Sequence, residues 1–230
     1  MSNPSRVGII LVTLGSSLAW GQQPSAPQVP SPPKAIRTSV TPRLPGNALK
    51  VPLFRQATGY SCGACSLQSV LCYWQVFSGQ ESQLYARLDT TPKDGTAPEK
   101  LVEVARSFGL TARMQEDTTL EDLRKALAQG ITIILNLQAW RDAVPQAKPW
   151  KETWAEGHYV VLVGMDDHHL YAMDPSVSGA YAYLPKAEFL ERWHDFEDRT
   201  GTRREYHQLA VFIQGAKPAG TFPRPLVKME

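Results

Sequence analysis

The chain has 230 residues, enough for one ordinary domain with extensions or for two small domains. Hydrophobic residues make up 43% of it, so a core can form, and the formal net charge at pH 7 is only +2. No window approaches a basic stripe, so neither nucleic acid nor an anionic membrane surface is an expected partner.

The first 21 residues are typical of an export signal. Arg6 precedes an apolar run over 7–14, and small residues follow as far as Gly21. A basic start, a short apolar stretch and an Ala-x-Gly step are the parts of a secretory signal peptide. The run is too short for a permanent span, so we favour cleavage over an uncleaved tether. We therefore expect a periplasmic or extracellular protein with no other membrane insertion.

Residues 22–49 are rich in proline and show almost no apolar periodicity. Such a stretch cannot bury enough surface to offset its ordering entropy, so we predict a solvated linker. Residues 216–230 also contain several prolines and are predicted to be a similar tail. The folded unit is therefore expected at 50–215.

Three helices are predicted in the first half. The first is amphipathic, because its apolar residues recur at three- and four-residue spacing. It is expected over 62–77 and is closed by Gly79. The second helix starts at a capping box of Thr96 and Glu99 and stops at Gly109. The third starts at Thr119 with Asp122 and ends near Gly130.

The second half changes to a strand pattern. Close spacing without crossover helices indicates an antiparallel sheet, and helices followed by a sheet give an α+β architecture. The predicted strands are 131–137, 158–164, 170–173, 180–184 and 209–213, with a short helix around Phe189 and Trp193 before the last.

The chain has three cysteines, Cys62, Cys65 and Cys72, so at least one thiol is free. Cys65 and Cys72 are two helical turns apart, about 10 Å, which is too far for a disulfide. Cys62 stands where a loop enters the first helix, and the positive helix end favours a thiolate there. By residue type alone, Cys62 would be a small buried residue, but the residues near it favour a catalytic role. Gly63 after it allows another segment to approach closely.

Two further residues fit a nucleophilic cysteine. Gln56, six residues before Cys62, can donate a hydrogen bond to a developing oxyanion, with the backbone N–H of Cys62 as the second donor. His158 follows Gly157 at the start of a core strand, where a base would be held rigidly. Taken singly, both residues are more often structural.

An acidic residue should orient the imidazole, and Asp166, Asp167 and Asp174 compete for this role. The strand from His158 leads to the turn that holds the first two, roughly 25 Å away at ~3.3 Å per residue. The returning strand brings Asp174 back to the edge of His158. We therefore predict Asp174.

These residues resemble cysteine peptidase family 39, the bacteriocin-processing, double-glycine leader peptidases of the papain-like clan. The resemblance covers about residues 51–214 and implies a papain-like cysteine peptidase fold, with a catalytic helix in an N-terminal helical part packed on the antiparallel sheet. The segments that carry it are Gln56-x5-Cys62-Gly63-Ala64-Cys65, Gly157-His158-Tyr159-Val160-Val161-Leu162 and Met173-Asp174-Pro175.

The resemblance implies a role for each residue. Cys62 is the nucleophile and, through its backbone N–H, forms the oxyanion hole with Gln56. His158 is the base and later the acid, and Asp174 holds its tautomer. No cofactor or metal is implied, and the substrate is a peptide or protein. The best-known relatives are cytoplasmic domains of bacteriocin exporters, so an export signal here makes another peptide or a cell-wall substrate equally expected.

Three tryptophans, Trp140, Trp150 and Trp154, lie in the insert before His158. They predict either a substrate-binding wall or a satellite core, with equal weight.

Other readings stay open. A cell-wall amidohydrolase would use the same catalytic set, and a peptide-binding module could keep the fold without catalysis. Zinc at Cys62 and Cys65 with the pair His168–His169 is disfavoured, because that pair lies in the distal turn. The oligomeric state is not predicted.

Overall fold

The computed structural model describes residues 41–141, 148–199, 201–216, 218 and 226–228. The predicted signal peptide and residues 22–40 of the predicted linker lie outside these residues. In the part that is described, no helix combines the length and apolarity needed to cross a membrane.

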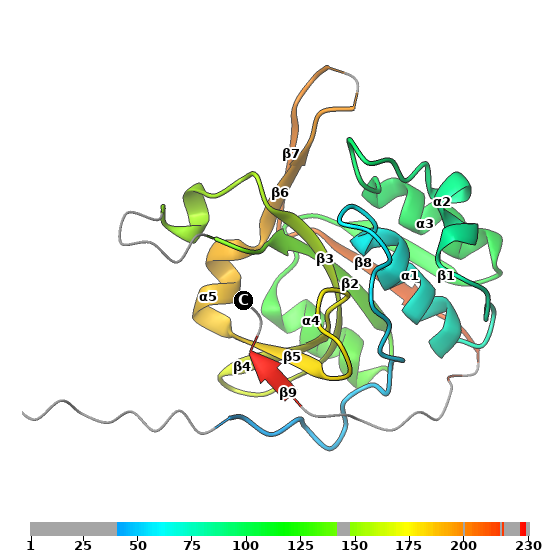
Figure 1. Cartoon of the computed structure of the whole chain (residues 1–230). Helices are drawn as coiled ribbons and strands as arrows, with labels where there is room; N and C mark the ends of the chain where they lie inside the picture. Colours follow the sequence, from blue (N-terminus) through cyan, green and yellow to red (C-terminus); the bar gives the residue numbers. More distant parts are fainter. Residues whose placement is uncertain (1–40, 142–147, 200, 217, 219–225, 229–230) are drawn as a thin grey trace, which may run out of the picture. The chain divides into compact units, whose positions relative to one another are not determined.

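A seven-stranded sheet forms the centre of the described unit (Figure 1). Its strands are β1 (Thr111–Gln115), β2 (Thr132–Gln138), β3 (Gly157–Met165), β4 (His169–Met173), β5 (Tyr181–Pro185), β8 (Ala210–Gln214) and β9 (Leu226–Lys228). They follow the order β1-β8-β2-β3-β4-β5-β9. Every neighbouring pair is antiparallel except β5 and β9. The predicted α+β fold with an antiparallel sheet is confirmed, with one parallel edge strand added.

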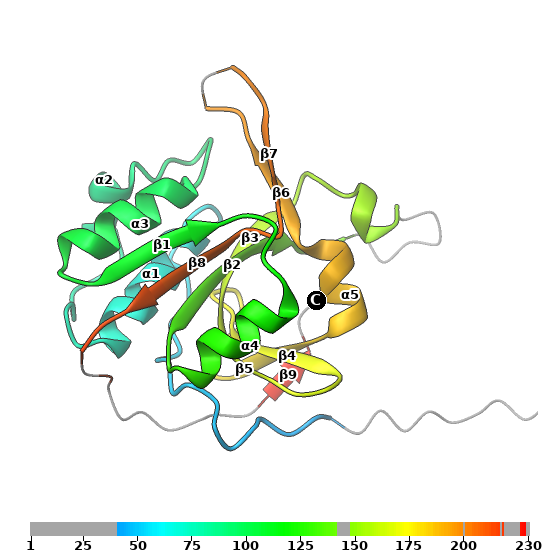
Figure 2. The same cartoon turned by 180° about the vertical axis from the view of Figure 1, so that it is seen from behind.

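Helices cover both faces of this sheet (Figure 2). They are α1 (Cys62–Tyr73), α2 (Ser82–Leu88), α3 (Pro98–Ser107), α4 (Leu120–Ala128) and α5 (Lys186–Arg192), with a 3₁₀ turn η1 (Trp150–Glu152). Ile134 and Val161 pack with α1–α3, whereas Ile133 and Leu162 pack with α4 and α5. Successive strand side chains point to opposite faces, which explains why β2 and β3 are buried at nearly every position.

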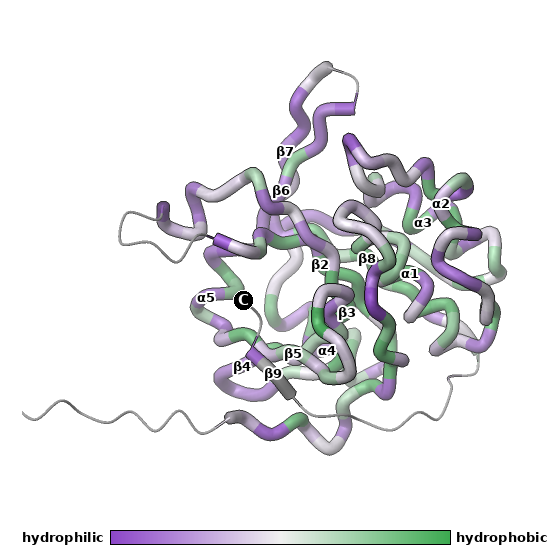
Figure 3. Tube along the Cα trace, in the orientation of Figure 1, coloured by the Kyte–Doolittle hydropathy of each residue, from purple (hydrophilic) through white to green (hydrophobic). Residues whose placement is uncertain are grey.

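A two-stranded hairpin of β6 (His194–Glu197) and β7 (Arg204–His207) forms a separate sheet. It rises away from the central sheet in both views (Figures 1 and 2). The hairpin is mostly hydrophilic (Figure 3), so it lacks the apolar alternation that marks a strand in sequence. The sequence analysis did not predict it, nor did it predict α2 or β1.

The predicted end of the first helix is wrong. α1 ends at Tyr73 instead of residue 77, because Gln75 adopts a left-handed φ of 58°. The N–H groups of Gln75 and Val76 donate to the carbonyls of Cys72 and Leu71, each at 3.0 Å. These two bonds form a Schellman motif. A glycine usually marks this position, and with glutamine there the end of the helix has no local signal.

Of the two helix starts with Thr as the signal, one is confirmed and one is wrong. The side chain of Thr119 accepts from Asp122 N–H at 3.1 Å, and Asp122 accepts in return from Thr119 N–H at 3.0 Å. α3 begins instead with Pro98 after Ala97, without a side-chain cap. Thr96 is bonded to the Thr90 hydroxyl at 2.8 Å. A proline at the first helical position needs no N–H partner.

The edges of the folded unit reach further than predicted. The N–H of Leu49 donates to the carbonyl of Val163 at 2.7 Å, and Leu44 and Leu49 pack on the core. At the other end, β9 lies beside β5 within the segment predicted to be a tail. Both segments add backbone hydrogen bonds that composition alone does not reveal.

Candidate active site

Cys62 is the first residue of α1, directly after the buried Ser61. A Cβ added to Gly63 would lie 2.7 Å from Thr96 Cβ and 3.1 Å from Tyr159 Cδ2. The close approach predicted at Gly63 is therefore confirmed, and it fixes the start of α1 against β3. Cys62 is partly exposed, as a nucleophile must be.

All three cysteines are free. Burial, followed by the negative charge of Glu81, raises the pKa of the Cys65 thiol far above its usual range. Burial also raises the pKa of Cys72. Both thiols therefore stay protonated at neutral pH. Within the described ranges, no three His, Cys, Asp or Glu side chains gather closely enough to hold a metal ion.

His158 and Asp174 come together at one edge of the sheet. His158 is the second residue of β3, and Asp174 follows the last residue of β4, its antiparallel neighbour. His158 Nε2 lies 2.7 Å from Asp174 Oδ1, and the two side chains are 1% and 2% exposed. Asp166 stands at the other end of the β3–β4 hairpin, where it accepts a hydrogen bond from the Tyr171 hydroxyl. Asp167 lies beside it in the turn.

Ser176 holds the Asp174 carboxylate in place. Its backbone N–H and its hydroxyl both donate to Asp174 Oδ1, each at 2.8 Å. Burial would raise the pKa of Asp174, but the hydrogen bonds from His158 and Ser176 outweigh it and lower the pKa. The sequence analysis missed Ser176. The signal was available, because an Asp side chain often accepts the N–H two residues ahead.

The surroundings of His158 favour its charged form. Burial alone would lower the pKa of the ring, but hydrogen bonding to Asp174, interaction with Cys62 and the negative charges of both raise it to about 9. The buried Nδ1 makes no hydrogen bond of standard geometry. Because Asp174 occupies Nε2, Nδ1 is the nitrogen left for the Cys62 thiol. Such contacts are often loose before substrate binds.

Gln56 lies in the loop before α1, tied to the Asp174 turn. Its backbone N–H donates to the carbonyl of Pro175 at 2.9 Å. Its side-chain Nε2 donates to the carbonyl of Thr58 at 2.7 Å, which uses one of the two amide hydrogens. The neighbouring Ala57 N–H donates to the Glu81 carboxylate at 3.2 Å. The loop is therefore pinned, and one amide hydrogen of Gln56 stays free of the Thr58 bond.

The three tryptophans have different surroundings. The Trp140 ring packs on the His158 imidazole, with centroids 4.5 Å apart, and is 39% exposed. Trp154 lines a cavity beside Cys62. Trp150 is buried, with the Arg192 guanidinium 4.0 Å from its ring centroid. Two of them therefore adjoin the candidate site, whereas Trp150 is buried and does not line the cavity. Residues 142–147 of the insert lie outside the described residues.

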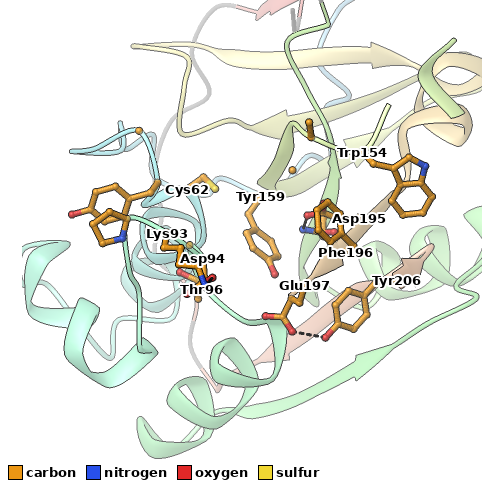
Figure 4. A pocket seen from close by; sticks show the side chains of 17 residues that line it. Cys62, Lys93, Asp94, Thr96, Trp154, Tyr159, Asp195, Phe196, Glu197 and Tyr206 are labelled. Carbon is orange, nitrogen blue, oxygen red and sulfur yellow. Dashed lines mark hydrogen bonds and ion pairs between the residues drawn. The ribbon is translucent and has the colours of Figure 1, made fainter. Parts of the chain in front are cut away.

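The cavity beside Cys62 has a volume of about 250 Å³. Figure 4 shows Cys62 on one side of it and Asp195, Glu197 and Tyr206 on the other, with the Tyr159 ring between them. The loop 92–96 before α3 and the β6–β7 hairpin form opposite walls. Sequence reasoning missed the acidic residues of this cavity, because the hairpin that carries them was not predicted.

Comparison with known proteins identifies the family. The model of the Peptidase_C39 like family matches residues 48–200. No protein with a curated description matches the chain. A solved structure described as a putative C39-like peptidase from Bacillus anthracis superposes with a TM-score of 0.51 at 16% identity, covering 74% of this chain and 98% of that one.

Two further structures are similar at the level of single peptidase domains. A double glycine motif protease from an AMS/PCAT transporter, solved in complex with its leader peptide, is 22% identical, covers 74% of this chain and 94% of that one, and has a TM-score of 0.49. The peptidase domain of Streptococcus ComA, a bi-functional ABC transporter, is 20% identical, covers 72% and 99%, and has a TM-score of 0.47. Because the family model spans well over half of the sequence, this chain belongs to the C39-like peptidase family and has its papain-like fold.

Proposed function

We propose that this chain is an exported cysteine peptidase that cleaves peptide bonds through an acyl-enzyme on Cys62. The observation that carries the proposal is the buried 2.7 Å contact between His158 Nε2 and Asp174 Oδ1, with Cys62 as the other polar neighbour of the ring. Burying a charged pair costs desolvation energy. A module that only binds peptides has no use for that pair beside a partly exposed thiol.

The first half of the reaction forms the acyl-enzyme. His158 already holds the proton on Nδ1, and the Cys62 sulfur attacks the carbonyl carbon of the scissile peptide bond as a thiolate. The oxyanion then accepts hydrogen bonds from the backbone N–H of Cys62 and from the free amide hydrogen of Gln56. Collapse of this intermediate breaks the C–N bond, and His158 gives its proton to the leaving amine.

The second half releases the acyl group. A water molecule gives a proton to His158 and attacks the thioester carbon. The C–S bond breaks, the carboxylic acid product leaves, and the proton stays on His158 beside the Cys62 thiolate. Asp174, fixed by Ser176, keeps the ring oriented and stabilises its positive charge. Trp140 covers one face of the ring and limits the access of water to the Nε2–Oδ1 bond.

The exported location rests on the signal-like residues 1–21. Export would bring the enzyme to peptide or protein substrates outside the cytoplasm. A fusion of residues 1–60 to a periplasmic reporter enzyme tests this, with residues 22–60 as the control. Reporter activity outside the cytoplasm from the longer fusion alone supports export, and equal activity from both rejects the signal.

Alkylation by iodoacetamide tests the catalytic pair without knowledge of the substrate. We expect Cys62 to react at least ten-fold faster at pH 7 than in the His158→Ala variant, because the imidazolium stabilises the attacking thiolate. Cys72→Ser is the matched control, since Cys72 is a partly exposed thiol on the same helix. If Cys62 reacts no faster than a free thiol, the site is not an activated pair.

Substrate class requires a second assay. Purified protein is incubated with a peptide library and, in parallel, with purified cell wall in a zymogram. Cleavage of peptides that is lost in Cys62→Ala supports the proposal. Clearing of cell wall without peptide cleavage would replace it with an amidohydrolase. If Cys62→Ala retains all activity, the acyl-enzyme mechanism is rejected.

A further inference from the structure

The cavity beside Cys62 has the size of a single side chain. Its volume of about 250 Å³ lies below the 300–1,000 Å³ that is usual for a site holding a whole small molecule. Cys62 itself belongs to the lining, so an occupant of the cavity would be attached close to the bond under attack.

A carboxylate without a cation lies in this cavity. Asp195, on β6, is largely buried and accepts hydrogen bonds from Asn136 Nδ2 at 2.7 Å and Gln138 Nε2 at 3.0 Å. No lysine or arginine in the described part of the chain pairs with it. Burial raises the pKa of Asp195 to about 6, against the opposing effect of its hydrogen bonds. The carboxylate therefore remains ionised at neutral pH with its charge uncompensated.

The other acidic groups of the cavity already have partners. Glu197 accepts from Arg199 Nε at 3.2 Å and from the Tyr206 hydroxyl at 2.7 Å. Asp94 lies 3.5 Å from Lys93. Lys93 also lines the cavity, but its side chain is 80% exposed and its ammonium pairs with Asp94, not with Asp195. The remaining titratable residues of the lining, Tyr60, Cys62 and Tyr159, supply no positive charge. Asp195 is thus the one lining carboxylate, among the described residues, that lacks a cation.

A second group in the cavity also lacks a partner. Asn136 is 4% exposed and lines the cavity, and its Oδ1 accepts no hydrogen bond from the described residues. A buried acceptor without a donor costs free energy. The amide nitrogen of Asn136 already donates to Asp195, so the atom without a partner is the acceptor Oδ1. A ligand that pairs with Oδ1 must therefore donate a hydrogen bond.

The position of Asp195 ties this site to the catalytic strand. A Cβ added to Gly157 would lie 2.3 Å from Asp195 Oδ2, so the carboxylate fills the space that a larger residue before His158 would take. Three aromatic residues, Tyr159, Phe196 and Trp154, also line the cavity. The Arg203 guanidinium already lies over the Phe196 ring at 4.0 Å and over the Trp154 ring at 5.0 Å. Aromatic faces attract cations. The negative end at Asp195 and the Tyr159 ring together complement a long, positively charged side chain.

We propose that this cavity is the subsite that recognises an arginine or lysine side chain of the peptide substrate, with Asp195 and Asn136 Oδ1 as its acceptors. The inference rests on the proposed peptidase function and names its substrate class. A guanidinium brings five N–H donors and an ammonium three. Either group would compensate Asp195 and satisfy Asn136 at once, whereas an uncharged side chain leaves the carboxylate unpaired.

Paired substrates measure this charge preference. Peptides cleaved by the wild type are resynthesised with arginine or with its uncharged analogue citrulline at each position flanking the cleaved bond. We expect kcat/KM to be about 10–100-fold higher for arginine at one position, the effect of a buried hydrogen bond to a charged group. In Asp195→Asn this ratio falls towards one. Asp198→Asn, an exposed acid outside the cavity on the same hairpin, keeps the wild-type ratio.

A second measurement separates this proposal from the peptidase assignment. Acetyl-arginine methylamide is tested for protection of Cys62 against iodoacetamide, beside the citrulline compound. Protection by arginine alone, lost in Asp195→Asn, supports the subsite even if no peptide is cleaved, and then only the peptidase function fails. Equal behaviour of arginine and citrulline in both assays with the wild type overturns the subsite, whether or not Asp195→Asn folds.

Discussion

Replacing Asp174 with asparagine separates the charge of this residue from its shape. Asparagine keeps an oxygen that can accept from His158 Nε2, but it removes the negative charge that, with the hydrogen bond, is the main cause of the raised pKa of His158. Burial then dominates, and we expect the pKa of the ring to fall from about 9 to 6.5 or below. The ring would be largely neutral at pH 8.

The size of the effect follows from these two values. At pH 8 the protonated fraction of His158 falls from about 90% to about 3%, so proton donation to the leaving amine slows about 30-fold. Asp174→Ala also removes the acceptor and leaves Ser176 unpaired, so we expect a loss of about 10³-fold or more. Asp174→Ala should therefore lower the activity more than Asp174→Asn does.

The assay is an NMR titration of the His158 ring, assigned with His158→Ala, together with kcat/KM against pH on a cleaved peptide. Asp167→Asn is the matched control, because it removes an exposed carboxylate in the distal turn of the same hairpin. If the ring of Asp174→Asn titrates within half a unit of the wild type, the charge of Asp174 does not hold the proton, and the reasoning is refuted.

Three further predictions concern stability and shielding. Folded His158 keeps its proton to about pH 9 but would release it near 6.5 when unfolded. The stability that the raised pKa of His158 adds is therefore complete below about pH 6.5 and declines by up to about 3 kcal/mol as pH rises to 9. Urea unfolding of the wild type and of His158→Ala across this pH range measures the decline. Equal pH dependence of the two proteins would contradict the prediction. Trp140→Ala removes the 4.5 Å ring contact and should lower kcat/KM about five-fold, because an aromatic pair is worth about 1 kcal/mol. An unchanged rate would show that the ring does not shield the site. Gly63→Ala places a Cβ 2.7 Å from Thr96 Cβ and should cost about 1–3 kcal/mol in thermal unfolding, whereas Gly46→Ala, with open space around it, should cost little.

A few residues determine the chemistry of the candidate site through local spacing. The known rise per residue in two antiparallel strands is enough to predict that Asp174 lies beside His158. The same calculation excludes Asp166 as the partner of His158. The start of α1 at Cys62 follows from apolar periodicity over the next turns. These inferences succeed because each depends on one hairpin or one helix.

Contacts between distant segments lie beyond such arithmetic. The amide of Gln56 is directed by Thr58 and, through its neighbour, by Glu81, 24 residues from Ala57. Which tryptophan packs on His158 depends on the path of a long insert. From the sequence alone, a substrate-binding wall and a satellite core were equally expected for the three tryptophans.

The sequence by itself determined the α+β class, the position of Cys62 at the start of a helix and the His–Asp hairpin, because period and spacing act within one element. Only the tertiary structure decided what faces Cys62. Asp195 lies on a polar hairpin that gives no strand pattern, and it reaches the cavity because β6 packs beside β2 and Gly157 leaves room for its carboxylate. Such a neighbour is set by packing of segments far apart in the chain, which no local pattern records.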